Sequence, residues 1–173
     1  LGGDQVPELT QSEASLILRY APGEKVVVTK QKRHPVNHNF PVYVLMHTSG
    51  FKNVLGGDYT SNYTELSVTK RFWLNSYGRI DLYGRAGAQW NKVPFPLLIT
   101  PAANNSYIIQ RNMFNMINNM EFMNDRFISM EIQWDLSGKL FNRIPLLKHL
   151  KWREVIGFKT LYGKLTDKNN PQK

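Results

Sequence analysis

The chain of 173 residues contains no cysteine. Disulfides, thiolate catalysis and cysteine-based metal sites are therefore excluded. Long hydrophobic runs are also missing, and a membrane-spanning helix needs about 20 consecutive apolar residues. Neither His47 nor His149 has an evident nucleophile partner in the sequence. Acidic side chains alternate along predicted strands instead of converging in a catalytic pair, so the sequence predicts a protein that is not an enzyme.

Acidic residues are few relative to basic ones, 13 against 22, which gives a formal net charge of +9. A basic excess can indicate nucleic-acid binding. Here the basic residues are spread along the chain, and only residues 30–33 (KQKR) form a cluster. Diffuse charge of this kind is typical of a solvated surface. We therefore expect no nucleic-acid partner.

His34 and His38 have the spacing of metal ligands on one face of a helix. Pro35 lies between them in a polar stretch, however, and no third ligand is near in the sequence. The sequence predicts two solvated loop histidines, with no metal site and no cofactor.

The most informative stretch is residues 79–90 (RIDLYGRAGAQW), in which apolar or small residues alternate with mostly polar ones. A period of two places each set on its own face of a β-strand. The length suits a tilted transmembrane strand of about 9–11 residues. The polar set contains four side chains that we predict to face the lumen of a β-barrel, namely Arg79, Asp81, Arg85 and Gln89.

The same alternation returns at residues 127–136, where Glu131, Gln133 and Asp135 share one face. Two carboxylates and an amide on one face of a hydrophobic strand need water or polar partners. A barrel lumen supplies both, so these three residues are also predicted to face a lumen.

Five further stretches have the pattern of strands, although the second is only a short β-branched run: residues 13–20, 25–30, 41–49, 63–73 and 151–163. The predicted fold is all-β, an antiparallel transmembrane β-barrel portion of about six to seven strands. Because a bacterial outer-membrane barrel needs at least eight strands, the barrel is predicted to be incomplete. Strands of soluble sheets alternate in the same way, so a soluble sheet is the alternative. Lys70 interrupts one apolar face, and its long side chain is expected to snorkel towards water.

The connection of residues 91–125 is too long for a hairpin turn. Its apolar residues Ile109, Met113, Met116, Ile117 and Met120 recur at helical spacing. The sequence therefore predicts one long, partly helical loop that is extracellular and packs over the barrel mouth, or that enters the lumen. The last residues, 165–173, are predicted to be a polar tail.

Connection lengths alternate along the chain, as they do in barrels with short periplasmic turns and longer outside loops. On that assignment Trp73, Trp134 and Trp152 fall at periplasmic strand ends and Trp90 falls at the outer end. We interpret these four as aromatic side chains at the membrane interfaces.

Seven blocks of the sequence resemble one known family: residues 15–25, 47–59, 70–78, 93–110, 120–127, 142–155 and 165–171. The family comprises Bacteroidota outer-membrane proteins with an N-terminal carboxypeptidase-regulatory-like module and a C-terminal barrel domain of unknown function. Its barrel is thought similar to that of the insertase and surface-antigen superfamily. The resemblance implies that residues 1–173 are an internal portion of a single barrel domain in the bacterial outer membrane. Its implied partners are the lipid bilayer, lipopolysaccharide and other outer-membrane proteins.

Three functions follow as hypotheses. The first is a non-enzymatic outer-membrane barrel that serves envelope assembly or forms a subunit of a larger outer-membrane complex. The second is an outer-membrane protein insertase in the strict sense. The chain lacks the Arg-Gly-Phe loop motif of that branch, but Arg111 or Arg126 could extend from the long loop to Glu131 or Asp135. The third is a soluble β-sheet domain that binds a ligand.

Overall fold

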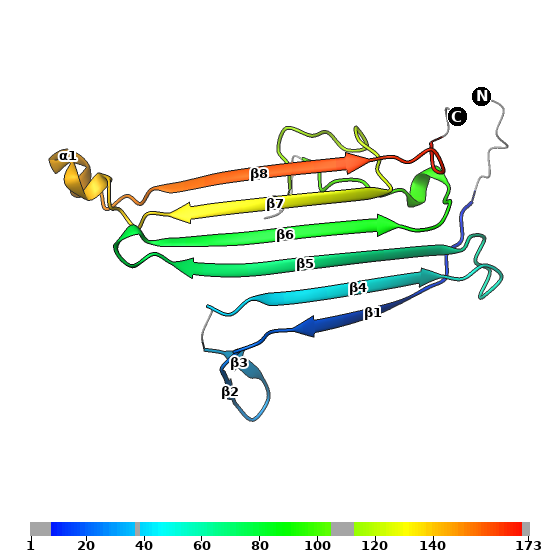
Figure 1. Cartoon of the computed structure of the whole chain (residues 1–173), viewed down its shortest axis with the longest axis horizontal. Coiled ribbons are helices and arrows are strands. Elements are labelled where there is room, and N and C mark those ends of the chain that lie inside the picture. The colour runs from blue at the N-terminus through cyan, green and yellow to red at the C-terminus, as the bar shows by residue number, and fades with distance from the viewer. Residues whose placement is uncertain (1–7, 37–38, 105–112, 171–173) are drawn as a thin grey trace.

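A single antiparallel sheet dominates the computed structural model, which describes residues 8–36, 39–104 and 113–170. Its six strands follow the order β1-β4-β5-β6-β7-β8, so each long strand pairs with the next one along the chain (Figure 1). Their bounds are β1 Glu13–Tyr20, β4 Val42–Gly50, β5 Ser61–Trp73, β6 Arg79–Gln89, β7 Arg126–Asp135 and β8 Val155–Lys164. The predicted all-β, antiparallel architecture is confirmed.

Shorter elements occupy the connections. A separate hairpin joins β1 to β4, and the β5–β6, β6–β7 and β7–β8 connections carry helical turns. These elements are β2 Val26–Val28, β3 Arg33–Pro35, η1 Asn75–Tyr77, η2 Phe95–Leu97, η3 Phe141–Arg143 and α1 Pro145–Lys148. No helix among the described residues is long and apolar enough to cross a membrane.

The β2–β3 hairpin revises the prediction for the polar stretch after residue 30. His34 lies in β3, exposed and paired with Val27, so it is part of a strand and not of a loop. His38 lies outside the described residues. Within the described ranges there is no group of three side chains that could hold a metal ion.

The strand register separates the side chains of the sheet into two faces. Leu18, Leu45, Leu66, Ala86, Ile128 and Tyr162 form one continuous row across all six strands. We call the face that carries this row the apolar face. Side chains one residue away point to the opposite side, because successive residues of a strand alternate. That opposite side, which carries Glu65, Arg85 and Glu131, is the polar face.

The tight β5–β6 turn fixes the register of the two longest strands. Gly78 has a φ of 80°, a conformation that residues with a side chain rarely adopt. A Cβ at this position would lie 1.9 Å from the carbonyl oxygen of Asp135 in β7. The turn therefore requires glycine both for its backbone conformation and for its close approach to the neighbouring strand.

The sheet is open. Within the described part of the chain, β1 pairs only with β4 and β8 pairs only with β7, so no closed barrel is present. The predicted incomplete transmembrane barrel stays a prediction, because the structure shows an open antiparallel sheet. The last strand begins at Val155 instead of residue 151, because the turn after α1 continues to Lys151, whose φ of 52° is not that of a strand.

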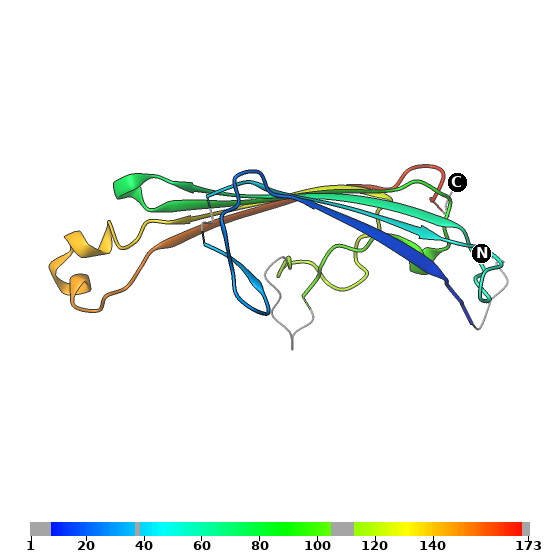
Figure 2. The same cartoon turned by 90° about the horizontal axis from the view of Figure 1, so that it is seen from below.

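Burial in this sheet is the reverse of that in an ordinary soluble protein. Leu18, Ile128 and Phe158 on the apolar face are 54%, 57% and 58% exposed. The buried hydrophobic residues lie in the connections: Phe40, Val93, Leu98, Ala103, Met113 and Leu136. Figure 2 shows part of the β6–β7 connection lying beneath one side of the sheet. The cavity residues described below identify this covered side as the polar face.

Candidate functional site: the polar face and its cover

The centre of the polar face is a bidentate ion pair between neighbouring strands. Arg85 of β6 donates from Nε and Nη2 to the two carboxylate oxygens of Glu65 in β5, each at 2.9 Å. The hydroxyl of Tyr63 donates to the same carboxylate at 2.6 Å. Paired N–H···O bonds of this kind are stronger and more directional than single ones. Only 15% of the Glu65 side chain is exposed, so its charge depends on these donors.

A second charged group lies nearer the β5–β6 turn. Arg71 of β5 donates to Asp81 of β6 through Nε at 2.5 Å and Nη2 at 3.0 Å. Arg79 lies between two carboxylates, 3.7 Å from Asp81 and 3.4 Å from Asp135 of β7. Positive and negative groups thus alternate across three strands.

Lys159 extends the ionic network to the last strand. Its Nζ lies 3.4 Å from the carboxylate of Glu131 in β7 and 3.5 Å from the carbonyl oxygen of Met113, to which it donates. Lys159 of β8 therefore contacts both the neighbouring strand β7 and the segment that covers the sheet.

Gly87 leaves space on the polar face for two rings. A Cβ on Gly87 would lie 2.4 Å from the Phe127 ring and 2.9 Å from the Tyr63 hydroxyl. The guanidinium of Arg85 lies 5.5 Å from the centre of the Phe127 ring, within range of a cation–π contact. The glycine thus permits the aromatic and charged groups to pack together.

All seven residues that the sequence places towards a lumen share this face: Arg79, Asp81, Arg85, Gln89, Glu131, Gln133 and Asp135. Five of them take part in the ion pairs above. Gln133 pairs in register with Asp81, and Gln89 is buried at the far end of β6. The sequence identified these residues but not their partners Glu65, Arg71 and Lys159, which lie on strands with a weaker alternation.

The described residues of the β6–β7 connection, 90–104 and 113–125, form a cover over part of the polar face, and the predicted helix is wrong for residues 113–124. Residues 113–124 contain turns and isolated bridges between Ala103 and Phe114 and between Ile99 and Asn124. Met120 has a φ of 61°, which is incompatible with a right-handed helix, and Met116 is 94% exposed. Ile109 lies outside the described residues.

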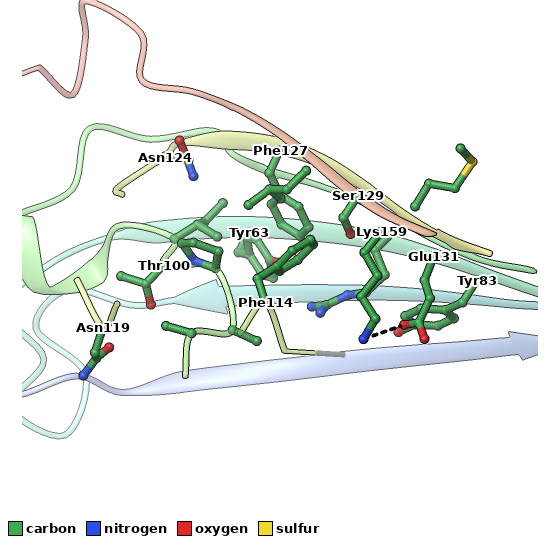
Figure 3. A pocket seen from close by; sticks show the side chains of 17 residues that line it. Tyr63, Tyr83, Thr100, Phe114, Asn119, Asn124, Phe127, Ser129, Glu131 and Lys159 are labelled. Atoms are coloured by element: carbon green, nitrogen blue, oxygen red, sulfur yellow. Dashed lines mark ion pairs between the residues drawn. The ribbon is translucent and has the colours of Figure 1, made fainter. Parts of the chain in front are cut away.

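A cavity of about 320 Å³ lies between the cover and the sheet. Its wall includes Tyr63, Tyr83, Arg85, Glu131 and Lys159 from the strands and Phe114 from the cover (Figure 3). Cavities of this size accommodate small ligands. The cations and carboxylates in its wall are already joined in ion pairs, so the arrangement resembles a packed polar interior more than a catalytic centre.

Asp125, at the start of β7, joins the cover to the end of the chain. It is 1% exposed and accepts hydrogen bonds from the backbone and hydroxyl of Thr166 and from the amide of Asn169. Asn169 also accepts from the backbone of Val93 and donates to the carbonyl of Asn91. The predicted polar tail is therefore wrong for residues 165–170, which bind both ends of the cover. We call these contacts the clasp.

The clasp holds a buried negative charge. Burial alone would raise the pKa of Asp125. The hydrogen bonds from Thr166 and Asn169, together with the nearby Arg126 cation, outweigh burial and place the pKa below its usual value. Asp125 is thus a structural anion, which sequence inspection missed because its partners lie more than 40 residues away.

Of the two arginines predicted to extend from the long loop, the described one, Arg126, does not join the ionic network of the polar face. Arg126 is exposed and shares the apolar-face register with Ala88 and Lys164, opposite Glu131 and Asp135. Arg111 lies outside the described residues.

The four tryptophans lie at the ends of the strands. The Nε1 atoms of Trp90 and Trp134 donate to Thr64 Oγ1 and to the Tyr77 carbonyl, each at 2.9 Å, and Trp73 donates to Asn39 Oδ1. Trp152, which precedes β8, is 58% exposed beside Phe141. The Nζ of Lys70 lies 2.5 Å from the carbonyl oxygen of Asn39, to which it donates, so this cation leaves the apolar face towards the strand end.

Residues 3–170 match the model of one family, described as "Family of unknown function (DUF5686) C-terminal domain". No curated protein and no solved structure matches the chain.

Proposed function

We propose that this chain, which belongs to the family of unknown function DUF5686 through its C-terminal domain, contributes its sheet to a β-barrel in a bacterial outer membrane. The proposed role is not enzymatic: the barrel serves envelope assembly or forms a subunit of a larger outer-membrane complex. Its partners are lipid, lipopolysaccharide and other outer-membrane proteins.

The reversed burial of the two faces is the observation that carries this proposal. On five of the six strands, all but β6, this face carries leucine, isoleucine, phenylalanine or tyrosine side chains that are 38–67% exposed, an arrangement that is unfavourable in water. Lipid chains remove that cost. The strands are 8–13 residues long, close to the roughly 9–11 that cross a bilayer when tilted.

The polar face has the features of a barrel interior. Four of its carboxylates, those of Glu65, Asp81, Glu131 and Asp135, are only about 15% exposed and are paired with cations of neighbouring strands. A barrel lumen is polar and can be filled by a loop that folds inwards. The described part of the β6–β7 connection lies on this face, and we propose that it occupies the lumen.

Both sheet edges require partners in a membrane. Unpaired N–H and C=O groups in hydrocarbon cost several kcal/mol each, so open edges do not occur there. β1 and β8 each leave one edge unpaired within the described residues. We propose that additional strands join these edges and close the barrel.

The test places one positive charge on each face at adjacent positions of β7. Ile132 pairs with Leu82 and Phe158 on the apolar face, whereas Gln133 pairs with Asp81 on the polar face. We expect Ile132→Arg to prevent stable membrane assembly, because arginine on a lipid-facing position costs about 2–4 kcal/mol near the bilayer midplane. Gln133→Arg serves as the control and should assemble normally beside two carboxylates.

Assembly is measured in the full-length protein by membrane fractionation. It is also measured by gel electrophoresis, from the heat resistance of the folded protein's band in detergent. Equal assembly of both variants, or recovery of the native protein in a soluble periplasmic fraction, would overturn the barrel. The latter result would favour a soluble sheet that binds a ligand in the cavity beneath the cover.

A further inference from the structure

Charge is distributed unequally between the two ends of the sheet. At the α1 end, the described residues of the connections 21–41, 74–78 and 136–154 carry nine basic and two acidic side chains. At the opposite end, the described residues of the connections 51–60, 90–125 and 165–170 carry three basic and four acidic ones. The positive charge of the described connections therefore gathers at one end.

The β7–β8 connection combines this charge with exposed apolar groups. We define its residues 139–153 as the rim segment. Five large apolar side chains of the rim segment are 46–80% exposed: Leu140, Ile144, Leu146, Leu150 and Trp152. Five cations are interleaved with them: Lys139, Arg143, Lys148, Lys151 and Arg153. Interleaved basic and apolar residues are typical of segments that lie in a membrane interface.

The rim segment is an ordered part of the fold. Glu154, just before β8, is 8% exposed and its carboxylate accepts a hydrogen bond from the backbone of Phe141. Burial alone would raise the pKa of Glu154, but backbone N–H groups, among them those of Phe141 and Leu140 in the rim segment, outweigh burial and lower it. The ammonium of Lys139 lies 3.0 Å from the centre of the Tyr77 ring in the β5–β6 turn. These contacts tie the rim segment to the sheet, beyond the ends of β7 and β8 (Figure 1).

The rim segment is also continuous with the apolar face. Trp152 lies three residues before β8, whose side chains Ile156 and Phe158 belong to that face. Trp134 of β7 pairs in register with Ile156. A membrane that covers the apolar face therefore reaches its polar boundary at the level of the rim segment.

We propose that the rim segment binds the headgroups of anionic phospholipids. Its ammonium and guanidinium groups pair with headgroup phosphates, while Leu146, Leu150 and Trp152 enter the boundary of the acyl chains. This inference rests on the proposed membrane-spanning role of the sheet. It adds the chemical class of lipid and the end of the barrel that selects it.

The test compares two double variants in the full-length protein. Lys148→Gln/Lys151→Gln removes two exposed cations of the rim segment, and Lys52→Gln/Lys92→Gln removes two exposed cations at the opposite end. Each protein is reconstituted into vesicles of phosphatidylcholine, alone or with a one-third fraction of phosphatidylglycerol. Spin-labelled phosphatidylglycerol and phosphatidylcholine then report how strongly each lipid is held at the protein surface.

We expect the native protein and the control to prefer phosphatidylglycerol, and the preference to weaken at high salt. A basic residue near an anionic surface raises affinity roughly fivefold, so the rim variant should lose most of the preference. Normal incorporation with no preference, or an equal loss in the control, would overturn the rim proposal and leave the barrel intact.

Failure to incorporate into either vesicle would overturn the barrel instead. Sedimentation of the protein with phosphatidylglycerol vesicles is then decisive for the rim segment. Binding of the native protein that disappears in Lys148→Gln/Lys151→Gln would support the rim proposal. No binding of the native protein would overturn the rim proposal as well as the barrel.

Discussion

At the scale of single residues, the chain places charge where neighbouring strands neutralise it. The carboxylates of Glu65, Asp81 and Glu131 each lie within 3.4 Å of a cation from an adjacent strand. A half-buried charge that lost its partner would destabilise the fold, because its desolvation would be uncompensated. The polar face is therefore a connected unit, and not a set of independent surface groups.

Asp125 yields a prediction about acid stability. Its folded-state pKa lies below the ordinary value of about 3.9, so its contribution is complete above that value and is lost as the pH falls through the folded-state pKa. Asp125→Asn should lower the unfolding free energy near neutral pH by about 1–3 kcal/mol, since its hydrogen bonds lose their charge. The difference from the native protein should disappear in acid. Urea unfolding in detergent, at pH values from neutral to strongly acidic, measures this difference in unfolding free energy.

Asp167→Asn is the control, because Asp167 lies in the turn whose residues Thr166 and Asn169 bind Asp125 but is itself exposed. We expect it to change the unfolding free energy much less than Asp125→Asn does. An unchanged gap between Asp125→Asn and the native protein across the whole pH range would contradict the structural anion.

The sequence predicted which residues share the polar face but not how they are paired. Alternation of period two assigns Asp81 and Asp135 to one side of their strands. It does not fix the register, which brings Arg71 to Asp81 and Lys159 to Glu131. The clasp at Asp125 was missed for the same reason, since it depends on contacts far apart in the chain.

At the scale of elements, strands were predictable and the cover was not. A strand in this sheet carries apolar side chains on one face and paired polar side chains on the other. Its alternation can therefore be recognised in the sequence. The spaced methionines of the cover are not a helical stripe. The described Met113 is buried, whereas Met116 is 94% exposed, and tertiary contacts determine which of them packs. The β2–β3 hairpin was missed because β3 has only three residues and contains a proline.

The β5–β6 turn yields a prediction at this scale. Gly78→Ala should destabilise the fold by at least about 1–3 kcal/mol, the cost of a strained backbone conformation. The clash with the Asp135 carbonyl adds to this cost. Gly84→Ala is the matched control, because a Cβ on Gly84 meets nothing within 4 Å. Thermal unfolding of the two variants in detergent compares them, and equal stability would show that the turn does not need glycine.

At the scale of the whole molecule, one exposed apolar surface and one covered polar surface explain most other features. The length of the strands, the tryptophans at their ends and the exit of Lys70 towards Asn39 all fit an apolar band with polar boundaries. Family membership alone supplies no function, so the proposed role in the envelope rests on the exposure of the apolar face and the burial of the polar face.

The most direct measurement uses the absence of cysteine from this chain, which makes any introduced label unique within it. Single fluorescent labels at Met130→Cys and Ile132→Cys report on the apolar face. Single fluorescent labels at Ser129→Cys and Gln133→Cys report on the polar face. In bilayers of the assembled full-length protein, nitroxides on the lipid chains should quench the first pair strongly and the second pair weakly. Equal quenching at all four positions, or quenching of the first pair only by aqueous iodide, would contradict a lipid-facing sheet.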